Sequence, residues 1–179
     1  MWGEAVMKRL VAQSSIPFDN ISTPVDALLP LLPFLPKKLR VWECAHGMGM
    51  LSGHLLRFGY KLIAEPNDFL MWQPESCDWD CIVTNPPYST RLRYSFLVRA
   101  YSLGRPFAFL LPYTTLETPR RQALFCKYGI ELILWDERIN FTGGSGNWFP
   151  VAWFTWGFNL PKQLNFVEME PLRRKYLKV

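Results

Sequence analysis

The sequence predicts an α/β fold in which helices cover the faces of a mostly parallel sheet. Between residues 39 and 128, short apolar runs alternate with stretches of helical periodicity, and this order is typical of parallel sheets. Two later apolar runs, 130–135 and 151–158, have no helical pattern between them, so we expect them to pair antiparallel at one edge. The 179 residues suit one domain, and the 49% hydrophobic content provides a core.

The first half of the pattern contains three predicted strands. Residues 41–42 form the first, and a glycine loop at 43–49 leads from it into a helix with apolar residues at 51, 55, 56 and 58. The second strand covers 60–64 and the third covers 80–84. Pro86 and Pro87 end the third strand, because a proline has no N–H to donate to the sheet.

The second half begins with helical spacing over 92–100 and a buried strand at 106–111. Thr118 and Pro119 have the residue types of a helix N-cap and first helical position. We treat 1–179 as a single domain, with an N-terminal lid or helical segment at 1–37 and a basic tail at 171–179.

Charge is unevenly distributed along the chain, whose net charge is +5. Residues 62–80 contain five acids and no cation, whereas 91–127 contain seven cations and Glu117 as the lone acid. The tail adds four cations without an acid. A polyanionic partner fits the basic side, but a solvated helical face or chain end fits the same pattern.

Neither a membrane segment nor a metal site is predicted. No apolar run approaches the roughly 18 residues of a spanning helix, and the first ten residues lack the apolar centre of a signal peptide. We therefore expect a soluble, cytoplasmic protein with no membrane partner. Cys77 and Cys81, taken with His46 or His54, match no zinc-binding spacing.

The glycine loop is the first candidate site. Gly47 and Gly49 allow positive φ and close backbone approach, and such a loop after a strand is where a nucleoside cofactor sits in open α/β sheets. Ala45 replaces the first glycine of the usual fingerprint, so a structural turn is an equal interpretation. Glu65 follows the second strand with a spacing that suits an acceptor for ribose hydroxyls, or an ordinary exposed acid.

The tetrapeptide Asn85-Pro86-Pro87-Tyr88 is more specific. The Asn85 side-chain oxygen and the Pro86 carbonyl can both accept from one –NH2 group, and proline fixes the carbonyl direction. Tyr88 offers a ring on which a flat base can stack. A Pro-Pro turn that merely ends the strand is the alternative.

The loop and the tetrapeptide together resemble the S-adenosylmethionine-dependent amino-group methyltransferases of the Rossmann-like class. More specifically, they are similar to the small phage and prophage adenine-specific DNA methyltransferases. The likeness covers nearly the whole chain, through 23–24, 42–43, 68–70, 83–88, 116–117, 120–121, 124–125 and 153–156. It implies a class I methyltransferase sheet and methyl transfer from S-adenosylmethionine to the N6 amine of adenine in DNA.

The resemblance also implies residue roles. The catalytic residues would be Asn85, Pro86, Pro87 and Tyr88, which hold the target base. The cofactor's methionine end would lie against Glu43, Ala45, Gly47 and Gly49. Glu65 would bind the ribose and Asp68 and Phe69 the adenine, while Thr23 and Pro24 close a lid and Asn85 adjoins the cofactor.

The sequence also departs from the family pattern. His46 replaces a smaller residue in the glycine loop, and Asp80 follows Glu65 by only 15 positions, so the family's third strand is reduced or absent. No target-recognition domain is inserted. A second copy of the chain or another partner could supply the recognition surface.

Two other functions remain open at this stage. The same tetrapeptide can hold the –NH2 of adenine in RNA or of a protein glutamine. The chain could also be a non-catalytic cofactor or nucleic-acid binder that retains the fold. The glycine run 143–146 fits a hairpin connection or a phosphate grip, and Trp148 with Phe149 fits edge packing or base stacking.

Overall fold

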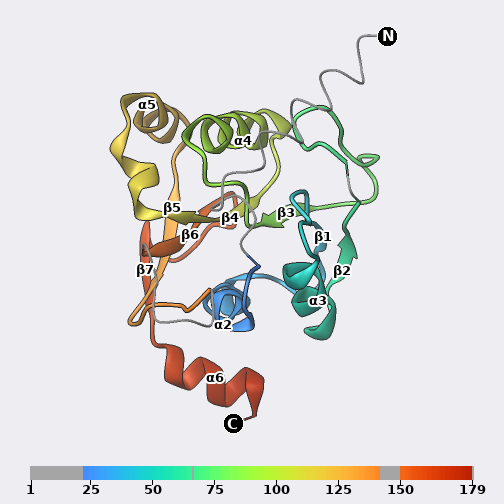
Figure 1. Ribbon diagram of the computed structural model, residues 1–179, viewed down its shortest axis with the longest axis vertical. Helices are drawn as coiled ribbons and strands as arrows, with labels where there is room; N and C mark the ends of the chain where they lie inside the picture. Colours follow the sequence, from blue (N-terminus) through green and yellow to red (C-terminus); the bar gives the residue numbers. More distant parts are fainter. Residues whose placement is uncertain (1–21, 66, 142–149, 179) are drawn as a thin grey trace.

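The computed structural model describes residues 22–65, 67–141 and 150–178 (Figure 1). The strands are β1 (Arg40–Trp42), β2 (Lys61–Ile63), β3 (Cys81–Thr84), β4 (Phe107–Pro112), β5 (Glu131–Trp135), β6 (Val151–Trp156) and β7 (Leu164–Val167). The α-helices are α2 (Val25–Leu28), α3 (Met50–Arg57), α4 (Thr90–Leu103), α5 (Pro119–Tyr128) and α6 (Met169–Leu177). Two 3-10 helices are η2 (Leu29–Phe34) and η3 (Tyr113–Glu117). The segment 142–149, with its glycine run and its Trp148-Phe149 pair, lies outside the described residues.

The strands form one sheet in the order β2-β1-β3-β4-β6-β5-β7. β2, β1, β3 and β4 run parallel to one another, and β6 runs antiparallel to both β4 and β5. This confirms the α/β fold with a mostly parallel sheet and an antiparallel hairpin. The hairpin is not at the edge, however, because β7 pairs parallel to β5 outside it.

Strand β7 was not predicted because its polarity is inverted. Asn165 is buried, while its neighbours Leu164 and Phe166 are exposed. The Asn165 side-chain amide donates to the carbonyls of Leu132 (3.2 Å) and Lys162. These bonds stabilise a polar side chain where an apolar one is the usual signal of a strand.

At the opposite edge β2 is the outermost strand found in the described residues. The segment after β2 forms a turn where the family has a further strand. In this turn the backbone N–H groups of Met71 and Trp72 donate to the Asp68 carbonyl. This agrees with the expectation of a reduced third strand.

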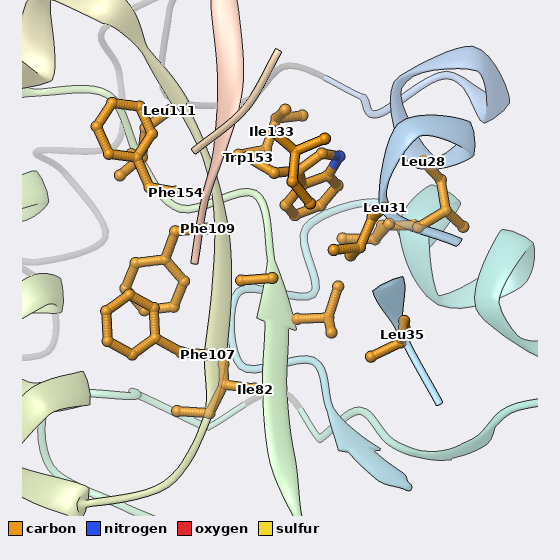
Figure 2. Packing of buried hydrophobic residues seen from close by; sticks show 14 of the residues in the cluster. Leu28, Leu31, Leu35, Ile82, Phe107, Phe109, Leu111, Ile133, Trp153 and Phe154 are labelled. Atoms are coloured by element: carbon orange, nitrogen blue, oxygen red, sulfur yellow. The ribbon is translucent and has the colours of Figure 1, made fainter. Parts of the chain in front are cut away.

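Helices cover both faces of the sheet (Figure 1). α4 and α5 lie on one face, and α2, α3 and α6 lie on the other. Alternation along the strands supplies both cores: Phe107, Phe109 and Phe154 point to the first face, whereas Trp153 and Ile133 point to the second (Figure 2).

The segment before β1 is part of the second core. Leu28 and Leu31 are fully buried against the sheet, and the Trp153 indole N–H donates to the Ala27 carbonyl at 2.7 Å. Residues 25–34 therefore pack as a fixed layer. Thr23, which precedes this layer, reaches the carboxyl edge of the sheet, whereas Pro24 is not among the residues that line the pocket there.

The basic tail forms helix α6, and one of its cations has a structural role. Arg173 pairs with Asp26 at 3.0 Å and with Glu137. The helix thereby holds α2 to the segment after β5. In the described part of the chain no helix is long and apolar enough to cross a membrane.

Candidate functional site

A pocket opens where the carboxyl ends of β1 and β3 meet. Glu43 directly follows β1 and Asn85 directly follows β3, and neighbouring parallel strands bring both to one edge. Thr23 completes the pocket from the segment before α2. The lining joins three distant parts of the chain, and it includes five of the predicted site residues: Thr23, Glu43, Ala45, Gly47 and Asn85.

Glu43 is the buried charge of this pocket, with 1% of its surface exposed. One carboxylate oxygen accepts from the Ala45 backbone N–H at 3.0 Å and from the Thr84 hydroxyl at 2.6 Å. The other accepts from the Ser52 hydroxyl at 3.1 Å. Glu43 thus ties the glycine loop, β3 and α3 together, and these bonds offset the cost of burying its charge.

His46 belongs to the same network. Its Nδ1 lies 3.0 Å from the Ser52 hydroxyl and 3.5 Å from the Glu43 carboxylate. Because the Ser52 hydroxyl donates to Glu43, its oxygen is left to accept, which favours a proton on His46 Nδ1. His46 therefore lines the pocket and is anchored to Ser52.

The two predicted glycines of the loop have left-handed backbone. Gly47 has φ of 51° and Gly49, which caps α3, has φ of 77°. A Cβ on Gly49 would lie 3.2 Å from the His46 ring. Glycine is therefore required at position 49 for two reasons: the positive φ and the close approach of the His46 ring.

Asn85 is oriented by a hydrogen bond. Its side-chain Nδ2 donates to the Thr23 hydroxyl at 3.0 Å. This donation orients the amide, and its oxygen, the group that could accept from a substrate amine, is buried.

The rest of the tetrapeptide is more enclosed. Pro86 is buried, and Tyr88 is only 8% exposed. Burial raises the pKa of the Tyr88 hydroxyl far above its usual range. Base stacking, the predicted role of Tyr88, requires an accessible ring face, which this arrangement does not offer.

The residues predicted for the ribose and adenine follow β2. Glu65 and Asp68 are exposed, and the Asp68 carboxylate accepts from the Leu70 N–H at 2.9 Å. Phe69 is only 2% exposed, and its ring centroid lies 4.7 Å from that of Phe96. The structure thus places Phe69 in the aromatic core and the two acids at the surface, and none of the three is in the pocket lining.

Two polar residues of the site were missed from the sequence. Ser52 and Thr84 are both buried and both donate to Glu43. Two features of the sequence could have indicated them: Ser52 is a hydroxyl residue on the buried side of a predicted helix, and Thr84 is one at the end of a buried strand. In the described residues no three His, Cys, Asp or Glu side chains gather as metal ligands.

The arrangement can bind a polar small molecule beside a substrate amine. The glycine loop offers backbone groups at close range, and its geometry is fixed by Glu43 and Ser52. Asn85 adjoins this loop across the pocket and offers an oriented amide.

Comparisons with known proteins identify the fold. No family model matches the sequence, and no curated protein does. A type I restriction-modification methyltransferase subunit from Streptococcus thermophilus is 13% identical with a TM-score of 0.52, covering 90% of this chain and 50% of that one. A Pyrococcus horikoshii protein proposed to be an RNA methyltransferase is also 13% identical with a TM-score of 0.52, covering 83% of this chain and 96% of that one.

These likenesses show the architecture that the protein shares with methyltransferases. The chain spans half the length of the streptococcal subunit. The likeness covers 90% of this chain, in which the carboxyl edge of the sheet holds the pocket described above.

Proposed function

We propose that the protein transfers a methyl group from S-adenosylmethionine to the N6 amine of adenine in DNA. The observation that carries this proposal is the Asn85 amide, which follows a buried strand and is held by Thr23 beside the glycine loop. The methyltransferase fold supports the same assignment. DNA is the expected substrate because the tetrapeptide resembles that of adenine-specific DNA methyltransferases.

The pocket suits the methionine end of the cofactor. Glu43 and Ser52 fix the loop, while Gly47, which lines the pocket, lets its backbone approach the ligand closely. Glu65 would accept from the ribose hydroxyls; it follows β2 at the same sheet edge and is exposed, outside the pocket lining. When bound, S-adenosylmethionine supplies an electrophilic methyl group on a sulfonium centre.

Asn85 has the central chemical role in this proposal. The adenine amine is a poor nucleophile because its lone pair is delocalised into the ring. Hydrogen bonds from the amine to the Asn85 side-chain oxygen, which must first be uncovered, and to the Pro86 carbonyl would favour the pyramidal geometry of the transition state. Positioning of the amine for in-line attack would supply much of the remaining rate, and the methylated amine would then lose its extra proton to water.

The cofactor's adenine needs a further rearrangement. Phe69 is buried, so a stacking role requires its ring to leave the contact with Phe96. Asp68 is already exposed and needs no such movement. Tyr88 likewise requires its ring to be uncovered before a flipped base can stack on it.

Replacement of Asn85 tests the proposal. Asn85→Ala should lower the methylation rate by a factor on the order of a hundred, as for other losses of one aimed polar group. Melting temperature and S-adenosylmethionine affinity should change little. Asn85→Asp retains an acceptor oxygen and should recover part of the rate.

The assay is incorporation of labelled methyl groups into DNA, with mass spectrometry for N6-methyladenine in DNA from expressing cells. RNA and a glutamine peptide are tested in parallel. Parental activity in Asn85→Ala would refute the catalytic role. Methylation of RNA or peptide with none on DNA would refute the substrate, and cofactor binding without any turnover would favour a non-catalytic binder.

A further inference from the structure

A second hollow lies between the N-terminal turns of α4 and α5. It has a volume of about 760 Å³, and the two helices lie on the same face of the sheet (Figure 1). We call it the α4–α5 groove, lined mainly by Thr90, Arg91, Tyr94, Arg120 and Arg121. Thr90 is five positions after Asn85, so the groove begins close to the proposed catalytic amide.

The cations of the basic stretch 91–127 divide into two groups. Arg99 donates to the Gln73 side chain at 3.0 Å, and Arg105 donates to the Ser76 carbonyl at 2.8 Å. These two arginines fasten the segment before β3 and have a structural use. Four of the remaining cations, at 91, 93, 120 and 121, gather at or beneath the groove.

Two of the four are buried beneath it. Arg93 donates to the hydroxyls of Thr114 and Thr115, at 3.1 and 3.3 Å, and Arg121 donates to the carbonyls of the same two residues, at 2.9 and 2.6 Å. Burial lowers the pKa of Arg121, and the charge of Arg93 lowers it further. Two guanidinium groups are therefore held close together, bonded to hydroxyl and carbonyl oxygens, and make the floor positive.

The other two cations are at the rim. Arg91 and Arg120 are both exposed, and neither takes part in an ion pair among the described residues. Tyr94 lines the groove with them and is half-buried. A positive floor, two accessible guanidinium groups and an aromatic ring are the features that bind single-stranded nucleic acid.

We propose that the α4–α5 groove binds the DNA strand next to the target adenine, with a phosphodiester between Arg91 and Arg120 and a neighbouring base on Tyr94. This inference rests on the proposed function, because the target base must leave the duplex to reach Asn85. The unpaired nucleotides beside it then need a positive path across the protein. The groove supplies that path within a few residues of the tetrapeptide.

Binding of a short fluorescein-labelled single-stranded DNA, measured by anisotropy at several salt concentrations, tests the groove without requiring turnover. The double variant Arg91→Gln with Arg120→Gln should weaken binding on the order of tenfold at low salt. The slope of log affinity against log salt should fall by about 1 to 1.5, because each phosphate contact to a single strand contributes about 0.7. Tyr94→Ala should weaken binding with little change in slope.

Arg57→Gln is the matched control, since Arg57 is an exposed arginine at the end of α3 on the opposite face. It should leave both affinity and slope unchanged, and none of the variants should alter S-adenosylmethionine affinity. Unchanged DNA binding in the double variant, or an equal loss in Arg57→Gln, would overturn the groove assignment. A larger loss for RNA than for DNA of the same sequence would overturn the choice of DNA.

Methylation assays on the same variants separate this inference from the proposed function. With the function correct, the double variant should raise the KM for DNA and leave kcat nearly unchanged. If no DNA is methylated by the parental protein, the proposed function fails, while the binding result still decides whether the groove holds DNA.

Discussion

Thr23 and Asn85 are 62 residues apart in the sequence, yet one hydrogen bond sets the orientation of the site's central amide. Asn85 itself was predictable, because a polar side chain directly after a buried strand lies at the carboxyl edge of a parallel sheet. The partner was not, because nothing in local periodicity indicates which distant hydroxyl reaches it. Thr23 was singled out only through a family resemblance, and for a different role.

Thr23→Val tests the orienting role of this hydroxyl. Valine is similar in shape but cannot accept from the Asn85 amide, so the amide can rotate away from the substrate amine. We expect kcat to fall about tenfold. This is less than the roughly hundredfold loss that a fully misplaced group can cause, because the Asn85 amide is still present. Thr23→Ser retains the acceptor and should retain the rate.

Steady-state methylation kinetics provide the measurement, with calorimetry of cofactor binding beside it. Equal kcat values for Thr23→Val and Thr23→Ser would mean that the hydrogen bond does not orient Asn85.

Burial was the least predictable property of single residues. Tyr88 and Phe69 occupy positions at which the family resemblance implies stacking on a base or on the cofactor's adenine. Both side chains are nevertheless packed inside the protein. Their enclosure results from neighbours on other elements, such as Phe96 of α4, that no local pattern reveals. Ser52 and Thr84 were missed for the same reason.

At the scale of elements, the strands β1 to β6 were predicted to within a residue or two, because apolar runs between helical patterns are a strong signal. Helix α5 begins at Pro119 as expected, although the Thr118 side chain makes no capping hydrogen bond. β7 was missed because its buried residue is Asn165.

Asn165→Ala should therefore destabilise the edge of the sheet. The change leaves the carbonyls of Leu132 and Lys162 without the amide that donates to them. We expect a loss of about 1–3 kcal/mol in the free energy of unfolding. Urea unfolding measures this loss. A change below about 0.5 kcal/mol, the usual size for a surface site, would show that the amide does not hold β7.

The pairing of β1 with β3 depends on a carboxylate as well as on the sheet. The Arg40 side chain donates to Asp80 at 2.7 and 3.0 Å, and its backbone N–H donates to the same group at 2.8 Å. These bonds hold the pKa of Asp80 well below its ordinary value of 3.8.

A lowered carboxyl pKa stabilises the fold at pH values above about 4, and the contribution is lost as the pH falls below that value. Arg40→Met removes the side-chain bonds, so unfolding free energy should fall less steeply below pH 4 than in the parental protein. Urea unfolding across a pH series makes the comparison, and parallel curves would contradict the assignment.

At the scale of the whole molecule, α6 joins parts of the chain that the sequence shows as unrelated. Arg173 bonds Asp26, three residues from Thr23, and also Glu137. The four cations of the tail look equivalent in the sequence. The structure distinguishes Arg173, which bonds two other segments, from Arg174, which is exposed on its own helix.

Arg173→Met should lower the free energy of unfolding by about 1 kcal/mol, since both ion pairs are partly exposed. It should also weaken S-adenosylmethionine binding a few-fold, because α2 carries the segment that lines the pocket. Arg174→Met is the control, as Arg174 is exposed and its ion pair in the described part of the chain is with Glu170 on its own helix. Equal effects of the two changes in thermal unfolding and calorimetry would refute the clamp.

The bond between Arg173 and Asp26 spans 147 residues, and the indole of Trp153 reaches back 126 residues to Ala27. During synthesis from the N-terminus, the segment that contains Thr23 therefore cannot form these contacts until Trp153 and Arg173 have been made. Contacts of such long separation form slowly, because the intervening chain must first be ordered. The nascent protein should accordingly complete the pocket at the carboxyl edge as a final step of folding, after the central strands have already paired.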